Sequence, residues 1–416
     1  MPSMHLDPVT RDLQRFPPVA VPPLRPVHFD WPTPRVADLP RAVEAAISRF
    51  ADHALRPGMR VAIGVGSRGI ANLPSLVRET ARVLRSRGAE PFVVPAMGSH
   101  GGATAEGQRA VLAELGVDET SVGCPVQSNF ETVPLGEIEG APVRMDRLAY
   151  DADATVVINR IKPHTSFGGP IQSGLAKMCA IGLGKQPVAE ALHARGPMGL
   201  RRLIPLVARE IITRGRVIGG LAVLENGAHD TAELHGLSGA EIGGPAEAAL
   251  LERATTLLPR IPFDELDVLV VEEMGKNISG TGMDTHTIGR VFIPGVADPV
   301  RPRIAVIVVL DLSAETGGNA NGIGLADVVT EQLLSKVDWN AVRMNALTSG
   351  LLGLWRVKVP WAAADEAGAM QLALRMCGRP DPGNARVARI RNTLALSEIA
   401  ISPSLMEEAR ALGATI

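Results

Sequence analysis

Short apolar runs alternate with amphipathic stretches along this chain, and no other feature constrains its fold as strongly. Residues 59–66 (MRVAIGVG) form a run typical of a buried strand, and residues 73–88 follow with apolar side chains at helical spacing. The same features predict three further strands at residues 90–97, 152–160 and 217–226. They also predict one further helix at residues 105–115. Such alternation favours a parallel sheet with helices on both faces.

From about residue 259 the pattern starts again. Two apolar runs, at residues 267–275 and 303–312, predict strands. Three later stretches, at residues 324–336, 339–347 and 365–377, predict helices. We therefore expect an α/β protein of two domains, residues 1–258 and 259–416, each a largely parallel sheet flanked by helices. The first forty residues are rich in proline and are expected to be extended, covering the surface or an oligomer partner.

The composition excludes several classes of protein. A net charge of −2 leaves no basic excess for nucleic acid, and one Tyr and four Trp offer few surfaces on which bases could stack. No run of eighteen apolar residues predicts a membrane span, and the N-terminus lacks a signal-peptide pattern. The three cysteines, Cys124, Cys179 and Cys377, form neither a CxxC pair nor a disulfide framework. These features predict a soluble cytoplasmic protein that acts on a small molecule; a homo-oligomer is compatible with them.

The lysines of this chain are few and clustered. Only six of its 42 basic residues are lysine, and three of them, Lys162, Lys177 and Lys185, fall within 24 residues. Arginine and lysine are nearly equivalent on a solvated surface, but a compact or nucleophilic amine must be lysine. Chance clustering on helix surfaces is the alternative. We interpret the cluster as part of a site.

Four polar, glycine-containing loops follow predicted strands, at residues 66–72 (GSRGIAN), 98–104 (GSHGGAT), 159–170 (NRIKPHTSFGGP) and 275–284 (GKNISGTGMD). In open α/β sheets, ligands bind beyond the carboxyl ends of the strands. Because the last loop belongs to the second predicted domain, we expect the site in a cleft between the two domains. None of these loops carries a complete GxGxxG or P-loop motif, so ordinary nucleotide binding is not predicted by motif.

Two of these loops present a histidine. His100 lies among glycines that permit close approach of a ligand, and His164 follows Pro163, which stiffens its loop. Each could be a structural residue or an acid–base group, and the presence of two at strand ends favours acid–base chemistry. His193, taken alone, is an ordinary surface or capping histidine.

In chain order, these residues resemble one known family. The resemblance lies in Ser67-Arg68 after the first strand, in GSHGGATAEGQ (98–108), in ADATVVINRIKPH (152–164), and in a Gly-Gly pair followed by a lysine and a later histidine. It is to the nickel-pincer nucleotide lactate racemases and their relatives that racemise or epimerise 2-hydroxy acids. The resemblance covers most of the first predicted domain and extends weakly into the second.

The resemblance implies an isomerase that moves hydride reversibly between C2 of a 2-hydroxy acid, such as a sugar acid, and a nickel-pincer nucleotide. His100 and His164 match the acid–base pair, Lys177 matches the lysine that tethers the cofactor, and His193, sixteen residues later, matches the nickel ligand. Some further residues match groups that hold the cofactor or the substrate: Gly168, Gly169 and Arg68 for the cofactor, and Arg68 and Lys276 for the substrate.

The chain departs from the family around the lysine. Gly168-Gly169 is followed by PIQSGLAKM, so Lys177 comes several residues later than the family pattern would place it. The cofactor could therefore be bound without a covalent bond, or Lys185 or Lys162 could serve as the tether. Two other functions stay open: a nickel-free hydro-lyase or hydrolase in the same cleft, and a non-catalytic protein that binds a nucleotide cofactor.

Overall fold

The computed structural model describes residue 13 and residues 15–416. It contains two compact units, which we name the N-terminal unit (Pro32–Leu258) and the C-terminal unit (Pro259–Ile416 together with the described residues before Pro32). The extended course expected for residues 1–12 and 14 lies outside the described residues. No helix in the described part of the chain is long and apolar enough to cross a membrane.

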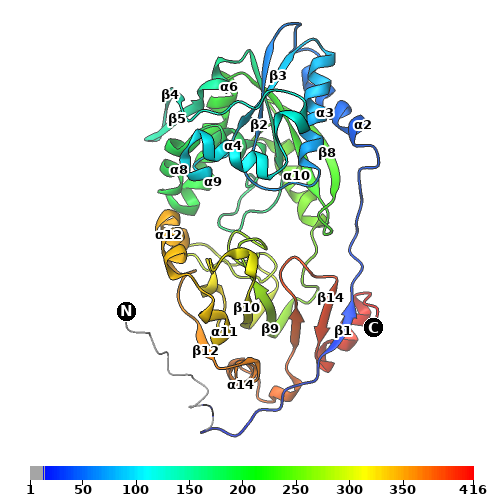
Figure 1. Ribbon diagram of the computed structural model, residues 1–416. Helices are drawn as coiled ribbons and strands as arrows, with labels where there is room; N and C mark the ends of the chain where they lie inside the picture. The colour runs from blue at the N-terminus through cyan, green and yellow to red at the C-terminus, as the bar shows by residue number, and fades with distance from the viewer. Residues whose placement is uncertain (1–12, 14) are drawn as a thin grey trace. The chain divides into compact units, whose positions relative to one another are not determined.

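The N-terminal unit is built on a five-stranded sheet in the order β3-β2-β6-β7-β8. Figure 1 labels β2, β3 and β8 of this sheet. The strands are β2 (Arg60–Val65), β3 (Glu90–Pro95), β6 (Ala154–Arg160), β7 (Val217–Glu225) and β8 (Thr231–Ser238). The first four are mutually parallel, as the apolar runs predicted, and β8 pairs antiparallel with β7. A separate antiparallel pair, β4 (Thr132–Ile138) and β5 (Ala141–Asp146), completes the strands.

Helices cover both faces of this sheet. Alternate residues of β2 point to opposite faces: Ile63 packs in a core with α2 and α3, whereas a Cβ at Gly64 would contact Leu183. The helices of this unit are α2 (Leu39–Ala51), α3 (Leu73–Ser86), η1 (Gly101–Ala103), α4 (Ala105–Glu114), α5 (Glu119–Val122), α6 (Arg147–Asp151), α7 (Leu175–Lys177), the π-turn η2 (Met178–Gly182), α8 (Lys185–His193), α9 (Gly196–Arg214) and α10 (Pro245–Leu257).

The C-terminal unit contains a seven-stranded sheet in the order β1-β14-β13-β9-β10-β11-β12. Its strands are β1 (Arg25–His28), β9 (Glu265–Met274), β10 (Arg303–Leu312), β11 (Val328–Thr330), β12 (Trp361–Ala363), β13 (Val387–Ile390) and β14 (Glu398–Ile401). The five strands from β13 to β12 are parallel, and β14 and β1 are joined to them antiparallel. Strand β1 therefore belongs to this sheet, although it lies within the predicted first domain.

The helices of the C-terminal unit are short. They are η3 (Ala314–Thr316), η4 (Ile323–Leu325), α11 (Glu331–Ser335), α12 (Trp339–Ser349), α13 (Leu351–Leu354), α14 (Glu366–Met376), η5 (Pro382–Asn384), η6 (Pro403–Leu405) and α15 (Met406–Ala411). The single helix predicted at 324–336 is wrong, because this stretch contains strand β11. Its Val-Val-Thr run is buried and pairs parallel with β10, an environment that favours β-branched residues.

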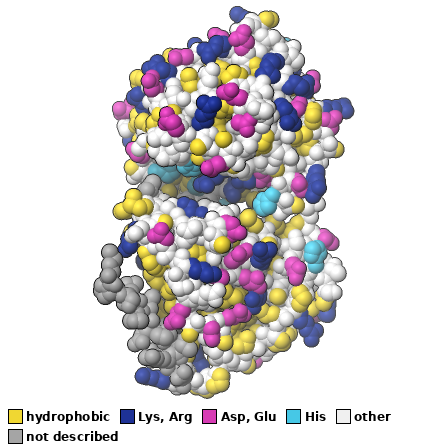
Figure 2. Space-filling view, viewed as in Figure 1, with side chains coloured by type: hydrophobic (Ala, Val, Ile, Leu, Met, Phe, Trp, Pro, Cys, Tyr) yellow, Lys and Arg dark blue, Asp and Glu magenta, His cyan; other side chains and the backbone are white. Residues whose placement is uncertain are grey.

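The α/β fold with largely parallel sheets is thus confirmed, whereas the interdomain cleft stays a prediction. Over the face drawn in Figure 2, acidic and basic side chains are interspersed and neither sign forms a broad stripe.

Candidate active site in the N-terminal unit

Strands β2, β3, β6 and β7 run parallel, so their carboxyl ends meet at one edge of the sheet. Strand β2 leads to Ser67 and Arg68, β3 to His100, β6 to Lys162 and His164, and β7 ends at Glu225. The structure therefore gathers loops 66–72, 98–104 and 159–170 at this edge. We name this place the carboxyl edge.

His100 contacts the neighbouring loop. Its Nδ1 lies in hydrogen-bond contact with Oγ of Ser67, and its own side chain is exposed. The loop is shaped by Gly98 and Gly101, which have φ of 62° and 67°, values that favour glycine. A Cβ on Gly101 would also lie 2.6 Å from the backbone nitrogen of Gln108. The glycines next to His100 thus bring its loop against α4.

His164 is oriented by its own loop. Its Nδ1 accepts the backbone N–H of Ser166 at 3.1 Å, and its backbone N–H donates to Oε1 of Gln172 at 2.6 Å. A ring nitrogen that accepts an N–H carries no proton, so the neutral ring carries its proton on Nε2. The ring of Phe167 lies beside the imidazole, with the two centroids 4.3 Å apart.

Lys177 ends helix α7, directly before the π-turn η2; such turns are frequent at functional sites. Its Nζ lies 5.9 Å from the centroid of the Phe167 ring. Desolvation, and secondarily the charges of Arg68 and Lys162, lower the pKa of Lys177 to about 7. Near neutral pH, a large fraction of this amine is therefore unprotonated and nucleophilic.

A buried carboxylate holds the start of α7. Glu247, from the first turn of α10, accepts the backbone N–H of Ala176 at 3.1 Å and that of Gly243 at 2.7 Å, and is 2% exposed. A Cβ at Gly174 would lie 2.2 Å from the carboxylate, so only glycine fits there. Burial raises the pKa of Glu247 against the effect of these donors. Glu247 thereby fixes the turn that carries Lys177.

His193 is the last residue of α8, in agreement with the helix on which the sequence placed it. Its Nδ1 lies 2.6 Å from the carbonyl oxygen of Ala189, which can only accept, so the proton is on Nδ1. No partner of Nε2 is found in the described part of the chain. Desolvation lowers the pKa of His193, and the nearby charge of Lys177 lowers it further. A neutral imidazole with its lone pair on Nε2 is suited to bind a metal ion.

Arginines complete the carboxyl edge. Arg160 forms an ion pair with Glu225, whose other oxygen accepts the N–H of Ala71 at 2.8 Å. Desolvation and the charge of Arg160 lower the pKa of Arg68, for which the described residues provide no carboxylate partner. Arg68 is thus a cation available to a carboxylate or a phosphate.

The structure brings some of the predicted residues together and leaves others elsewhere. Lys177 lies within electrostatic reach of Arg68, Lys162 and His193. In loop 159–170, Gly168 has open space where a Cβ would be, whereas a Cβ on Gly169 would contact the side chain of Arg201. The roles assigned to these residues stay predictions.

Lys276 belongs to the C-terminal unit, at the carboxyl end of β9. Its Nζ donates to Oδ1 of Asn345 at 2.5 Å, and its backbone N–H donates to Oγ1 of Thr316 at 3.0 Å. Its assignment to substrate binding stays a prediction.

Lys185, the alternative tether, is buried. It is 0% exposed and contacts Asp146, Gln108 and the carbonyl oxygen of Pro95, so its amine is not accessible for a covalent bond to a cofactor. Sequence reasoning assigned no role to Phe167, Gln108 or Glu247. Phe167 stands in a predicted site loop and Gln108 ends the stretch 98–108 that carries the resemblance, so both could have been found, whereas Glu247 lies on a helix with no distinguishing pattern.

No group of three potential metal ligands occurs among the residues that the structure describes. A metal ion at the carboxyl edge would take His193 as its protein ligand and its remaining donors from a bound cofactor. Three groups at this edge fit a nucleotide that carries its own metal donors: the amine of Lys177, Nε2 of His193 and the cation Arg68.

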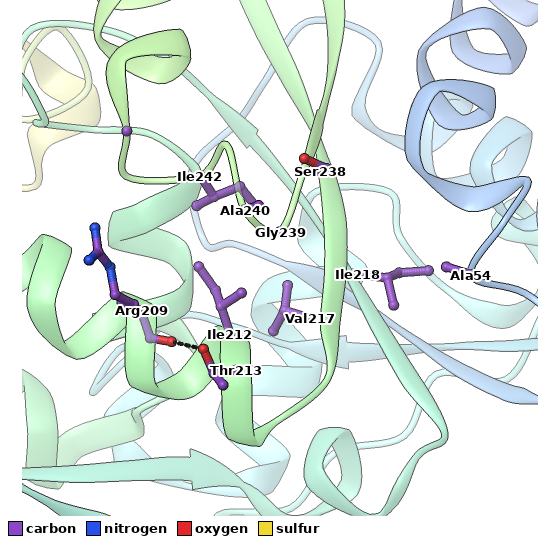
Figure 3. A pocket seen from close by; sticks show the side chains of 11 residues that line it. Ala54, Arg209, Ile212, Thr213, Val217, Ile218, Ser238, Gly239, Ala240 and Ile242 are labelled. Carbon is purple, nitrogen blue, oxygen red and sulfur yellow. Dashed lines mark hydrogen bonds between the residues drawn. The ribbon is translucent and has the colours of Figure 1, made fainter.

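A hollow of about 540 Å³ lies at the opposite edge of the sheet (Figure 3). It is lined around Val217, where β7 begins, by Ile212 and Ile242 among others, with Arg209 at its rim. Its two hydroxyl groups are already engaged: Thr213 donates to the carbonyl oxygen of Arg209, and Ser238 donates to Glu241. The candidate site is therefore the carboxyl edge.

Comparisons with known proteins identify the fold. No protein-family model matches this chain, and neither does any curated protein. Among solved structures, the lactate racemase apoprotein from Thermoanaerobacterium thermosaccharolyticum is similar, with a TM-score of 0.54 and 13% identity over 90% of this chain and 99% of that chain. A Thermotoga maritima protein solved by structural genomics has a TM-score of 0.48 and 18% identity over 68% of this chain and 72% of that one. At 13% identity the first likeness shows a shared fold, and a fold can serve many activities.

Proposed function

We propose that this protein racemises or epimerises a 2-hydroxy acid by reversible hydride transfer to a nickel-pincer nucleotide bound at the carboxyl edge. One observation carries the proposal: a lysine whose pKa is about 7 lies close to a histidine whose Nδ1 is bonded to the backbone. The loops that carry His100 and His164 lie at the same edge, where β3 and β6 end. The fold shared with a lactate racemase apoprotein supports the proposal.

Lys177 and His193 would hold the cofactor. The unprotonated amine of Lys177 could form the covalent tether, and Nε2 of His193 would bind the nickel ion. Arg68 would bind the cofactor phosphate or the substrate carboxylate, and the bound nucleotide would supply the acceptor and donor of hydride. A cofactor held without a covalent bond would use the same groups, with Lys177 as a cation or hydrogen-bond donor.

The two histidines would exchange protons with the C2 oxygen. If Nδ1–H of His100 donates to Ser67, then Nε2 of His100 is a base that takes the hydroxyl proton as the C2–H bond breaks. In the neutral ring of His164, Nε2–H can donate a hydrogen bond to the keto oxygen. To give a proton to that oxygen when hydride returns to C2, the ring would have to be an imidazolium, protonated on Nδ1 as well, and in the opposite direction a neutral His164 with Nε2 unprotonated would be the base.

The test is production of the protein together with a nickel-pincer biosynthesis pathway, followed by native and denaturing mass spectrometry. A nickel-nucleotide adduct that survives denaturation, and is absent from Lys177→Ala, supports the tether; an adduct seen only in the native spectrum supports non-covalent binding. The loaded protein is then assayed by circular dichroism against a panel of 2-hydroxy acids. No adduct, or turnover that persists after strict nickel depletion, contradicts the proposal.

One observation favours a second candidate, a nickel-free hydrolase. The contact between Oγ of Ser67 and His100 is the arrangement that activates a serine nucleophile. A catalytic triad would also need a carboxylate that orients the His100 ring. Hydrolysis of activated esters by the protein without cofactor, lost in Ser67→Ala, would favour this candidate.

A further inference from the structure

A buried polar network lies directly behind the loop of His100. Lys185 is 0% exposed, and Nζ lies 2.7 Å from the carbonyl oxygen of Pro95, 2.7 Å from Oε1 of Gln108 and 3.0 Å from Oδ2 of Asp146. Two of the three N–H donors of the ammonium group thus bind Pro95 and Gln108, and Asp146 adds an ion pair whose Oδ2 accepts no aligned hydrogen bond. The planar fork of arginine is a poor match for this arrangement, which accounts for a lysine in a chain that otherwise prefers arginine.

Gln108 connects this lysine to the loop. Its side chain is 0% exposed, and its Nε2 donates to the carbonyl oxygens of Gly98 at 2.9 Å and His100 at 3.2 Å. Its Oε1 accepts from Lys185, so the orientation of the amide is fixed: a flipped amide would present N–H groups to an ammonium and an oxygen to two carbonyls. The hydrogen bonds from Gln108 to the two carbonyl oxygens therefore depend on the hydrogen bond from Lys185 to Gln108.

We infer that Lys185 is a positioning residue, which sets the loop of His100 through Gln108 and is itself held by Asp146. This inference rests on the acid–base role proposed above for His100. Burial lowers the pKa of Lys185 and raises that of Asp146, and the attraction between the two opposes both shifts. A displacement of about 1 Å at a reacting group can lower a rate by about 100-fold, so a network this close to His100 matters to catalysis as well as to stability.

The most direct variant is Gln108→Glu. It keeps the shape of the side chain and an oxygen for Lys185, but it replaces the N–H donors with an oxygen that faces the carbonyls of Gly98 and His100. Gln186→Glu, on the half-buried side chain bonded to Glu190, is the matched control. The double variant Lys185→Met with Asp146→Leu removes both buried charges at once, so that neither remains unpaired.

The readout is the imidazole of His100 in the full-length protein labelled with 15N-histidine, assigned by its absence from His100→Gln. We expect the His100 ring resonances, and their titration with pH, to shift in Gln108→Glu and in the double variant, whereas His235 on β8 stays unchanged. Unchanged His100 resonances in Gln108→Glu overturn the inference, and this holds even where the double variant fails to fold.

Activity of the cofactor-loaded enzyme gives the second readout. We expect kcat to fall about 10- to 100-fold in Gln108→Glu while KM changes little, because the substrate would still be bound but the acid–base group misplaced. A rise in KM alone contradicts a positioning role. The two proposals fail separately: a shifted His100 in a protein without racemase activity overturns the proposed function, and an active enzyme whose His100 does not shift overturns the positioning role.

Discussion

Oγ of Ser67 and Nδ1 of His100 are in hydrogen-bond contact across the ends of two adjacent parallel strands. The residues are 33 positions apart in the chain, and β2 and β3 bring them together. The contact controls which nitrogen of His100 carries the proton, because a hydroxyl can donate to Nδ1 or accept from it. Its direction therefore decides whether Nε2 of the neutral His100 ring donates a hydrogen bond or is free to accept a proton.

Substitution of Ser67 separates the two candidate functions. In a racemase Ser67 only orients His100, so Ser67→Ala should lower kcat by about 10- to 100-fold and leave measurable activity. In a hydrolase Ser67 is the nucleophile, and its removal should abolish turnover. Steady-state kinetics of both reactions on one preparation provide the check, with Ser99→Ala in the next loop as the control.

His164→Gln and His100→Gln should each reduce racemisation by about 100- to 10,000-fold, the usual range for loss of an acid–base group. The measurement is circular dichroism of the substrate in D2O, with NMR of C2 alongside. Hydride transfer predicts that the native enzyme racemises its substrate while keeping the original hydrogen at C2. Deuterium that enters C2 at the rate of racemisation would contradict hydride transfer and favour a proton-abstraction mechanism.

The long central strands could be predicted, because strands buried on both faces must be apolar along their whole length. This is why β2, β3, β6, β7, β9 and β10 were found. The shorter strands were not found, among them β11, whose three residues are too few to distinguish a strand from the helices around it. The loops of His100 and His164 could be placed because parallel strands end at one edge.

The supporting residues of the site could not be predicted. Glu247 meets Ala176 from 71 residues away, and Lys185 meets Gln108 from 77 residues away. Nothing in the local sequence marks such pairs, because they depend on how the helices pack on the sheet. Lys185 was noticed as an unusual lysine, yet its burial, which excludes the tethering role, was visible only in three dimensions.

The amine of Lys177 should react as a base of pKa about 7, against 10.5 for an ordinary lysine. Between these pH values the folded protein binds fewer protons than the unfolded chain, so this group makes the free energy of unfolding rise with pH through that window. Trinitrobenzenesulfonate labelling of Lys177, followed by peptide mass spectrometry, should show a midpoint near neutrality. Arg68→Gln removes a neighbouring cation and should move the midpoint to higher pH; a midpoint that stays in place would exclude this electrostatic cause.

Gly174→Ala should destabilise the protein and disturb Lys177. The new methyl group would lie 2.2 Å from Oε1 of Glu247, so the carboxylate must leave the backbone N–H of Ala176, and a buried acceptor and donor lose their partners. We expect the free energy of unfolding to fall by about 1–3 kcal/mol. Urea denaturation measures this change, and Gly168→Ala is the control, because no atom lies within 4 Å of a Cβ there and its effect should stay within about 0.5 kcal/mol. Equal losses in the two variants would mean that the Glu247 carboxylate does not hold the turn of Lys177.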